Sequence, residues 1–352
     1  MTENEFYKNK TILVTGGAGS IGSEVVRSLI PLNPKVIRVF DNNETALFEL
    51  EQELDCMSLR SFIGDIRDKE RLARAMENVD IVFHGAALKH VPLCEFNPFD
   101  AIKTNVIGTQ NLLDVALDEE VKKVIFISTD KAVNPTNVMG TTKLLGERLT
   151  ISANHYKGNR KTVFSCVRFG NVLGSHGSVV PVFIRQLNEG KPLTITDPDM
   201  TRFIMSVSRS VELILKAGVL AQGGEIFILK MPALKINDLA DVIIGTFALK
   251  KGKKPAAIKK KIIGKRFGEK FFEELMYEHE AENAYENQSM FIIKPQSFEF
   301  GPKNTISLPK DFKKVKITEY NSKNQKLLTR DEIKNLLDTI NFNLNYPNLG
   351  CL

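Results

Sequence analysis

Between Thr11 and about Gly170, short segments rich in Val, Ile and Phe alternate with longer segments of helical period. The expected strands are Thr11–Thr15, Val36–Asp41, Ser61–Asp65, Ile81–His84, Val124–Thr129 and Thr162–Phe169. The expected helices are Ile21–Ile30, Glu44–Glu53, Lys69–Met76, Asp100–Leu117 and Val138–Tyr156. This alternation is typical of a parallel sheet built from strand–helix–strand units with right-handed crossovers. The chain is therefore expected to form a doubly wound α/β sheet with its ligand crevice beyond the carboxyl ends of the strands.

Beyond Gly170 the alternation loosens, and Gly, Pro and Asp interrupt the segment Gly174–Thr201. Further elements are expected at Ser208–Ala221, Ile226–Leu229 and Ile236–Ala248. We expect a nucleotide-binding domain at residues 1–175, to which 205–230 return, and a smaller substrate lobe at 176–204 and 231–295. Residues 296–352 form a polar extension with one expected helix, Arg330–Thr339, and carry no recognisable chemistry.

The composition is that of a soluble globular chain, with 352 residues, 43% of them hydrophobic and 26% charged. No stretch approaches the roughly 18–20 consecutive apolar residues of a membrane-spanning helix, and the segment Met1–Lys10 is polar. We therefore expect a cytoplasmic location and no membrane partner. The cysteines are far apart, which favours neither a metal site nor a disulfide framework; they are Cys56, Cys94, Cys166 and Cys351.

The net charge of +6 is mild, but basic residues crowd one short stretch. They are Lys250, Lys251, Lys253, Lys254, Lys259, Lys260, Lys261, Lys265 and Arg266. Such a run can attract nucleic acid or an anionic surface. No interleaved aromatic residues or nucleic-acid motif accompany it, so a solvated loop is favoured and no nucleic-acid partner is expected. Its last two cations are candidates for contact with a phosphate-bearing small molecule.

A glycine-rich turn follows the first expected strand and opens a helix. It contains Gly16, Gly19, Ser20, Ile21 and Gly22. Gly16 permits a sharp turn, Gly19 lets backbone N–H groups approach a pyrophosphate, and Gly22 lets the helix lie close to the sheet. A glycine triplet alone is weak evidence. Asp41, which ends the second strand, adds the second element of a dinucleotide site.

The surroundings of Asp41 favour NAD over NADP. A carboxylate at this strand end accepts hydrogen bonds from the adenosine ribose and repels a 2′-phosphate, and neither Asn42 nor Asn43 is basic. Asp65 and Ile66 follow the third strand, where an adenine edge is expected. Ala86 and Ala87 follow the fourth strand as small residues beside the cofactor. Each of these later pairs is equally consistent with ordinary turn chemistry.

Seven segments carry a resemblance to a known family. They are TGGAGSIGSE (Thr15–Glu24), GDIRD (Gly64–Asp68), AALKHVPLCE (Ala86–Glu95), STDKAVNPTNVMGTTK (Ser128–Lys143), RFGNVLGSHGSV (Arg168–Val179), MTRFIMS (Met200–Ser206) and GKRFGEK (Gly264–Lys270). The chain resembles an extended short-chain dehydrogenase/reductase of the polysaccharide-biosynthesis group, and within it the nucleotide-sugar 4,6-dehydratases acting on UDP-N-acetylglucosamine. The resemblance spans residues 11 to about 280.

One position departs from the wider superfamily. Its usual pair is Tyr-x-x-x-Lys, whereas this chain has Met139 before Lys143. A thioether is a poor proton acceptor, so the group that deprotonates the sugar 4-hydroxyl stays open. Some dehydratases of the group look similar in carrying Met there.

The resemblance implies a redox-neutral reaction in which the sugar is oxidised at C4, loses water across C5 and C6, and is reduced at C6. An elimination needs a base and an acid side by side. We assign Lys131 to the C5 proton and Asp130 to the C6 oxygen, with Thr129 bonded to the 4-oxygen. Lys143 holds the nicotinamide ribose, and Asn105 belongs to the same cofactor site by resemblance. A solvated Asp-Lys turn is the alternative.

The resemblance also predicts the sugar-nucleotide site. Arg202 and Arg266 are expected to bind the diphosphate, because guanidinium groups match phosphate oxygens, and Glu269 the uridine ribose. Phe267 replaces a proline common in that pattern. The remaining candidates near the sugar or cofactor are Lys89, Glu95, Asn171 and Val179, and each of the first three could instead be an exposed polar residue.

Several alternatives stay open. A UDP-sugar 4-epimerase shares the scaffold but does not need Asp130 and Lys131, and a GDP-sugar dehydratase shares most motifs. A non-catalytic NAD sensor is disfavoured by the intact Asp130, Lys131 and Lys143. One sequence does not separate retention from inversion at C5, although retention is preferred. A homodimer or larger homo-oligomer is expected through the helices near Asp100–Leu117 and Val138–Tyr156, and the product would feed a surface glycan.

Overall fold

The computed structural model describes residues 2–175, 177–250, 252, 254–295 and 306–339. The chain forms two compact units, and each is built from separate stretches of sequence. The first comprises Met1–Phe169, Ser208–Lys230 and Leu275–Glu319. The second comprises Gly170–Val207, Met231–Glu274 and Tyr320–Leu352.

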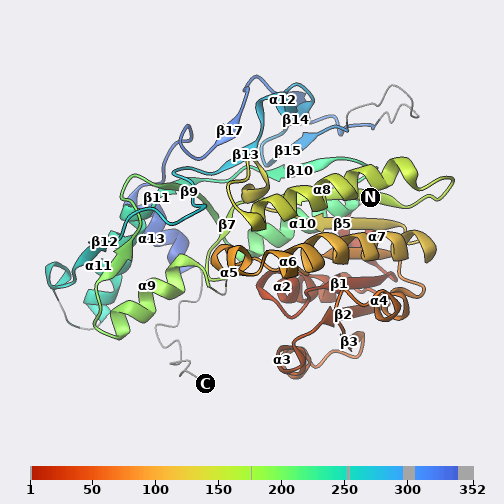
Figure 1. The fold of residues 1–352 in the computed structure, drawn as a ribbon, viewed down its shortest axis with the longest axis horizontal. Helices are drawn as coiled ribbons and strands as arrows, with labels where there is room; N and C mark the ends of the chain where they lie inside the picture. Colours follow the sequence, from red (N-terminus) through yellow and green to blue (C-terminus); the bar gives the residue numbers. More distant parts are fainter. Residues whose placement is uncertain (1, 176, 251, 253, 296–305, 340–352) are drawn as a thin grey trace. The chain divides into compact units, whose positions relative to one another are not determined.

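The first unit is organised around a ten-stranded sheet of order β16-β14-β15-β10-β6-β5-β4-β1-β2-β3 (Figure 1). Its parallel strands are β1 (Thr11–Thr15), β2 (Val36–Asp41), β3 (Leu59–Ile63), β4 (Ile81–His84), β5 (Lys123–Ile127), β6 (Val163–Arg168) and β10 (Ile226–Leu229). The order reverses at β1 and β4, which is the switch point where a doubly wound sheet binds ligands. The predicted fold class is confirmed.

The remaining strands extend this sheet in the antiparallel sense. They are β15 (Met290–Ile293), β14 (Ala284–Glu286) and β16 (Lys313–Lys314), which follow β13 (Glu274–Met276) and α12 (Glu278–Ala281) along the chain. β15 pairs with β10, so residues 275–295 belong with the large sheet. The expected boundaries placed these residues in the substrate lobe. The observed division differs because hydrogen bonding to β10, rather than proximity in sequence, decides where they fold.

Helices cover both faces of the parallel part of the sheet. The helices of this unit are α1 (Glu3–Tyr7), α2 (Ser20–Leu29), α3 (Glu44–Leu54), α4 (Lys69–Met76), α5 (Val91–Phe96), α6 (Pro98–Ile102), α7 (Gly108–Asp118), α8 (Val138–Tyr156) and α10 (Val207–Leu220). Side chains of α4, α7 and α8 pack in one buried cluster with Val82 of β4. The next residue, Phe83, points to the opposite face, where its ring lies 6.2 Å from that of Tyr7. Tyr7 in turn donates a hydrogen bond to the Leu215 carbonyl of α10.

The second unit has its own core. Its elements are β7 (Asn171–Val172), α9 (Val179–Asn188), β8 (Leu193–Ile195), β9 (Thr201–Met205), β11 (Ala233–Lys235), α11 (Ile236–Lys250), β12 (Lys260–Ile262), β17 (Tyr320–Asn321) and α13 (Arg330–Asp338). Apolar residues of α9, α11 and α13 meet in one cluster that includes Phe183, Phe247 and Ile333. The expected helix near Arg330 is therefore present, and it completes this core.

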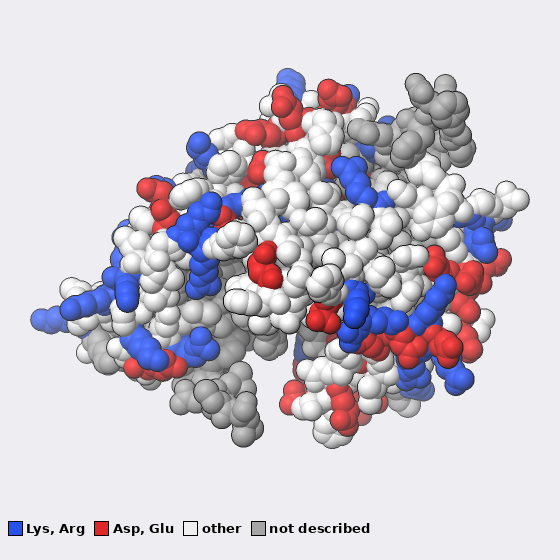
Figure 2. All heavy atoms as spheres, viewed as in Figure 1, with Lys and Arg blue, Asp and Glu red and all other residues white. Residues whose placement is uncertain are grey.

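Surface charge differs between the two units on the face that Figure 2 shows. Lys and Arg predominate over the part of the second unit that includes α11 and β12, whereas both signs mix over the first unit. Lys260 of the basic run is paired with Asp241 at 2.6 Å. Lys251 and Lys253 lie outside the described residues. Within the described residues, no helix is long and apolar enough to cross a lipid bilayer.

A buried histidine closes the end of β4. His84 Nδ1 lies 2.8 Å from Thr15 Oγ1, and its Nε2 lies 3.1 Å from Thr109 Oγ1. The Thr109 hydroxyl already donates to the Asn105 carbonyl, so it accepts from His84 Nε2–H, and the ring is neutral with Nδ1 as an acceptor. Burial lowers the pKa of His84 to about 3, and the charge of Lys143 acts in the same direction.

Neutral His84 predicts a loss of stability in mild acid. Below about pH 6.5, His84 becomes protonated in the unfolded chain but stays neutral in the folded chain. The free energy of unfolding therefore falls by about 1.4 kcal/mol per pH unit from this group alone. Between about pH 6.5 and about pH 5, urea unfolding should lose roughly 2 kcal/mol more in the wild type than in His84→Gln. The exposed His279 gives the control, because His279→Gln should keep the full wild-type slope.

Candidate active site

The glycine turn between β1 and α2 is closely packed. Gly16 has a φ of +65°, and a Cβ there would lie 2.7 Å from the Ala86 backbone nitrogen. A Cβ on Gly22 would lie 2.2 Å from the Gly16 carbonyl oxygen, so both positions require glycine. Gly19 is the N-cap of α2 and supplies no side-chain hydrogen bond to the first turn, which contains Ser20 and Ile21. A helix N-terminus that no side chain caps at this position suits an anionic ligand.

Asp41 ties the end of β2 to this turn. Its Oδ2 accepts from the Ala18 N–H at 3.1 Å, and its Oδ1 accepts from the Asn43 N–H at 3.0 Å. After β3, Asp65 is paired with Arg67, and hydrogen bonds from Arg67 hold the pKa of Asp65 below its usual range, with a smaller contribution from Asn42. The Ile66 side chain is buried in the core.

The segment after β4 is fixed by hydrogen bonds from a buried asparagine. Ala86 and Ala87 are partly buried in this segment, and Asn105 bonds to the backbone of the next residue, Leu88. The Asn105 amide donates to the Leu88 carbonyl and to Thr142 Oγ1, and its oxygen accepts from the Leu88 N–H. Asn105 is only 1% exposed, so the structure shows it shaping this segment through protein contacts.

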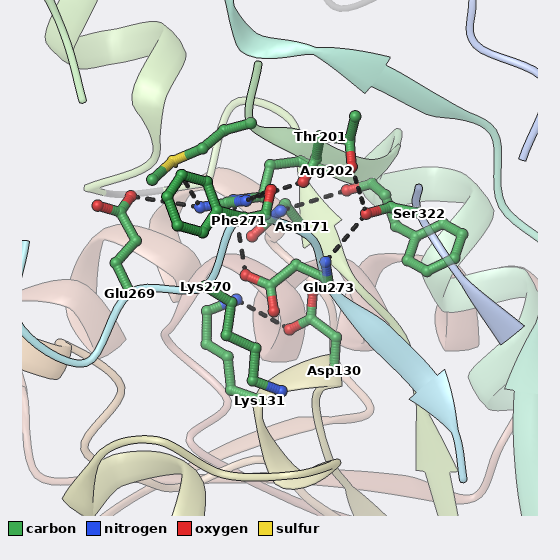
Figure 3. Close-up of polar contacts among 12 residues, drawn as sticks. Asp130, Lys131, Asn171, Thr201, Arg202, Glu269, Lys270, Phe271, Glu273 and Ser322 are labelled. Carbon is green, nitrogen blue, oxygen red and sulfur yellow. Dashed lines mark hydrogen bonds and ion pairs between the residues drawn. The ribbon is translucent and has the colours of Figure 1, made fainter. Parts of the chain in front are cut away.

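The turn after β5 brings three of the predicted residues together. Asp130 Oδ1 accepts from Thr129 Oγ1 at 2.9 Å. It also accepts from Lys131 Nζ at 2.8 Å (Figure 3). Asp130 is fully buried, and its Oδ2 has no hydrogen-bond partner among the described residues. Lys131 retains about a quarter of its side-chain exposure. The result is a buried carboxylate with one oxygen paired to an ammonium group and the other without a hydrogen-bond partner among the described residues.

Four contacts fix the backbone of this turn. The Ser128 and Asp130 N–H groups donate to the Val167 and Phe169 carbonyls at 2.7 and 3.0 Å. On the other side, a Cβ at Gly140 of α8 would lie 2.3 Å from the Lys131 carbonyl oxygen, so only glycine allows this approach. Tyr277 also donates its hydroxyl to the Ala132 carbonyl at 2.9 Å.

Lys143 lies on α8 below the turn. Its Nζ donates to the Ile127 carbonyl at 2.6 Å and lies 4.1 Å from the centre of the Phe126 ring. Burial lowers the pKa of Lys143 to about 8, while the Glu147 carboxylate pulls it upward. Met139, one turn earlier, is 3% exposed and packs in an apolar cluster with Cys94 and Ala101.

Two further candidates of the first unit are Glu95, which lies in α5 and contacts the start of α8, and Lys89, which precedes α5. The Glu95 carboxylate accepts from the Val138 N–H at 2.6 Å, so it satisfies a backbone donor in the first turn of α8, next to the N-cap residue Asn137. Lys89 is on the surface, and burial of part of its chain lowers its pKa.

In the second unit, Arg202 is the centre of a polar cluster (Figure 3). Its Nη1 donates to the Thr201 and Phe271 carbonyls at 2.8 and 3.3 Å. Its Nε lies 3.5 Å from Glu273 Oε1, and its Nη2 contacts Glu269 Oε1 at 3.3 Å. Arg202 is 7% exposed, so its position is set almost wholly by these partners.

The other candidates of this unit are more dispersed. Asn171 donates its amide to the Phe203 carbonyl at 3.3 Å. Val179 begins α9 and packs against the core of the unit. Arg266 is exposed, and its N–H donates to Glu269 Oε2 at 3.2 Å.

Sequence reasoning missed the residues that support these groups. Arg168 is fully buried, and its guanidinium group donates to the carboxylates of Glu147 and Glu280 at 2.7–3.1 Å. Glu147 follows Lys143 by one helical turn, which is the one local signal that could have marked it. Tyr277 and Glu273 carry no such signal, because their partners are distant in sequence.

Known relatives share most of this chain. An uncharacterised membrane protein of Methanocaldococcus jannaschii is 60% identical over 96% of this chain and 98% of its own. A UDP-N-acetylglucosamine 4,6-dehydratase (inverting) of Campylobacter jejuni is 41% identical over 95% of this chain and 98% of its own. A UDP-glucose 4-epimerase of Rickettsia rickettsii is 40% identical over 96% and 97%.

Solved structures agree with the fold. Pen from Bacillus thuringiensis matches with a TM-score of 0.87 and 43% identity, over 95% of this chain and 98% of that one. DesIV, a dTDP-glucose 4,6-dehydratase from Streptomyces venezuelae solved with NAD bound, matches with a TM-score of 0.66 and 25% identity, over 74% and 86%. The sequence pattern of the polysaccharide biosynthesis protein family matches residues 12–295. The chain therefore belongs to this family of extended short-chain dehydrogenases/reductases.

Proposed function

We propose that this protein is an NAD-dependent nucleotide-sugar 4,6-dehydratase that converts UDP-N-acetylglucosamine to its 4-keto-6-deoxy derivative. The observation that carries the proposal is the buried Asp130 with one oxygen paired to Lys131 and the other without a partner among the described residues. The Campylobacter relative, named for this reaction, supports the choice of substrate.

The described residues fit a dinucleotide. Gly16 and Gly22 leave no room for side chains at the turn, and the N-cap of α2 provides no competing side-chain bond. We assign the Asp41 carboxylate to the adenosine ribose, and none of residues 42–44 is basic, which favours NAD over NADP. DesIV, a structural neighbour, was solved with NAD.

The chemistry that NAD would supply when bound is reversible storage of hydride, taken from C4 and given back at C6. The groups of this chain handle the protons. After C4 has been oxidised, Lys131 removes the C5 proton, and Asp130 protonates the C6 oxygen as water departs. When substrate binds, the Thr129 hydroxyl turns its proton from Asp130 Oδ1 to the 4-oxygen and thereby stabilises the enolate that forms between these two events. The buried Lys143 orients the nicotinamide ribose.

The Asp130–Lys131 contact explains how a carboxylate can act as the acid. Lys131 Nζ donates the hydrogen bond, and Asp130 Oδ1 accepts it. Transfer of one proton along the 2.8 Å hydrogen bond gives a neutral amine and a carboxylic acid, which are the base and the acid that the elimination needs. Exclusion of water by bound substrate favours this neutral pair, because desolvation penalises charged groups.

Arg202 fits a diphosphate contact in the second unit. Three of its N–H groups are directed to Glu273 and to the two carbonyls, whereas the two on Nη2 contact Glu269 at 3.3 Å and the Met200 thioether at 3.4 Å. A thioether is a weak acceptor. The Nη2 protons are therefore the ones that phosphate oxygens can take, and Glu269 is then released for the uridine ribose.

A UDP-sugar 4-epimerase is the second candidate, favoured by the name of the Rickettsia relative. Both reactions begin by oxidation at C4 and need a base at the 4-hydroxyl, so the apolar surroundings of Met139 do not separate them. Only the dehydratase also needs a base at C5 and an acid at the 6-hydroxyl. An epimerase would therefore leave the paired Asp130 and Lys131 without a role. These residues favour elimination.

The stereochemical outcome proposed is inversion at C5. The name of the Campylobacter relative supports it, and the sequence-based preference for retention is not kept. Inversion requires that C5 receive its new proton on the face opposite to that from which Lys131 removed the first.

The reaction is tested by incubating the purified protein with UDP-N-acetylglucosamine in deuterated water and examining the product by mass spectrometry and NMR. We expect loss of one water, one solvent deuterium at C5, no accumulation of NADH, and C5 couplings of the inverted sugar. An unchanged mass with altered C4 configuration would establish the epimerase instead. GDP-N-acetylglucosamine, tested in parallel, should not react.

Replacing the base should stop turnover without releasing the cofactor. Lys131→Ala is expected to bind NAD as the wild type does but to reduce dehydration by roughly 10²–10⁴-fold, the usual contribution of a general base. Lys122→Ala removes an exposed lysine that is paired with Asp80 and serves as the control. Wild-type turnover in Lys131→Ala would refute the assigned role.

The close approach of α8 gives a further prediction. Gly140→Ala places a methyl group against the Lys131 carbonyl, so we expect a loss of about 1–3 kcal/mol in unfolding free energy and a larger loss of turnover as the Asp130–Lys131 turn shifts. A Cβ added at Gly245 in α11 would meet nothing within 4 Å, so Gly245→Ala should instead stabilise by about 1 kcal/mol and leave turnover unchanged. Equal behaviour of the two variants in urea unfolding would contradict the packing argument.

A further inference from the structure

Three residues of the C-terminal segment are buried in the second unit, although they lie beyond the residues that the family pattern matches. Tyr320, Asn321 and Ser322 are 4%, 3% and 0% exposed. The Tyr320 ring stacks on Phe203 at 4.9 Å, and its hydroxyl both accepts from the Met231 N–H and donates to the Met231 carbonyl. This segment is therefore an integral part of the unit.

Ser322 connects two neighbouring stretches of this unit (Figure 3). Its N–H donates to the Glu273 carbonyl at 2.8 Å, and its Oγ accepts from the Glu273 N–H at 2.9 Å. The same Oγ lies 2.9 Å from Thr201 Oγ1. Because a hydroxyl can donate one bond while accepting others, one buried serine binds both stretches at once.

The two stretches are those that hold Arg202. Thr201 precedes it on β9, and the Thr201 carbonyl accepts from Arg202 Nη1. Glu273 lies 3.5 Å from Arg202 Nε. The Thr201 N–H also donates to the Phe271 carbonyl, which is the second acceptor of Nη1. Ser322 thus fixes the spacing of the three acceptors that orient the guanidinium group, whereas Nη2 contacts Glu269 and the Met200 thioether.

We infer that Ser322 is a positioning residue for recognition of the substrate diphosphate, acting through Thr201 and Glu273 on Arg202. This inference rests on the proposed function, in which Arg202 binds the diphosphate of a UDP-sugar. Its physical basis is preorganisation: an arginine held by buried partners loses little freedom when it binds an anion, whereas a loosened one must be ordered by the ligand. Alanine at this position would leave the Thr201 hydroxyl and the Glu273 N–H with one partner fewer.

The test compares UDP with uridine, which lacks the diphosphate, by titration calorimetry on the full-length protein. Ser322→Ala should weaken UDP binding by about tenfold, the effect of losing one to two well-aligned charge-assisted bonds, and leave uridine binding unchanged. In turnover assays, the KM for UDP-N-acetylglucosamine should rise by a similar factor while kcat stays within about twofold. Thr201→Val removes the partner hydroxyl at nearly constant volume and should reproduce the weaker UDP binding.

Two control variants separate positioning from general damage. Tyr320→Phe loses the contacts to Met231 but keeps Ser322, so it should lower the melting temperature without changing the Kd for UDP. Ser307→Ala alters an exposed serine of the same C-terminal region and should change neither.

Each contrary outcome has a distinct meaning. If the wild type binds no UDP, the proposed function fails and this inference fails with it. If the wild type binds UDP and Ser322→Ala binds it equally well, the proposed function stands and the inference is wrong. Equal weakening of UDP and uridine binding, or equal weakening in Tyr320→Phe, would show that the segment supports the fold in general and would also overturn the assignment.

Discussion

The arrangement of the first unit depends on a guanidinium group that is wholly removed from water. Arg168 at the end of β6 is bound by Glu147 of α8 and Glu280 of α12, and it also donates to the Leu275 carbonyl. Removing Arg168 would leave two buried carboxylates without a counter-charge, which is far costlier than the ion pairs are favourable. The geometry of α8 relative to the sheet is therefore narrowly specified. Since α8 supplies both Gly140 and Lys143, the shape of the turn at Asp130 follows from this interaction.

Sequence periodicity predicted the parallel part of the sheet well, because alternating strands and helices of ordinary length are local signals. β1, β2, β4 and α8 begin and end where the pattern placed them. The pattern did not predict that β14 and β15 join the same sheet. Strands of three or four residues have little periodicity, and β10, with which β15 pairs, lies about 60 residues earlier. The choice of partner is a tertiary effect.

The candidate site divides in the same way. Motifs located the Gly16 turn, Asp41 and the Asp130–Lys131 pair, whose neighbours are close in sequence. They did not indicate that Asn105 and Glu95 make their observed bonds to the protein itself, to Leu88 and to the first turn of α8. Nor did they reveal Tyr277 or Ser322, because a tyrosine or serine that binds a backbone 145 or 49 residues away leaves no pattern in its own surroundings.

Both units are assembled from stretches that alternate along the chain, and this has a consequence during synthesis. The first unit lacks an outer part of its sheet until residues 275–319 have been made, and the second lacks α13 from its core until residue 338. Neither unit can complete its folding on the ribosome while the other is still unmade. A nascent chain halted at residue 300 would expose the apolar faces of α9 and α11 that Ile333 and Leu337 normally cover, so the C-terminal segment helps to keep the rest of the polypeptide from aggregating.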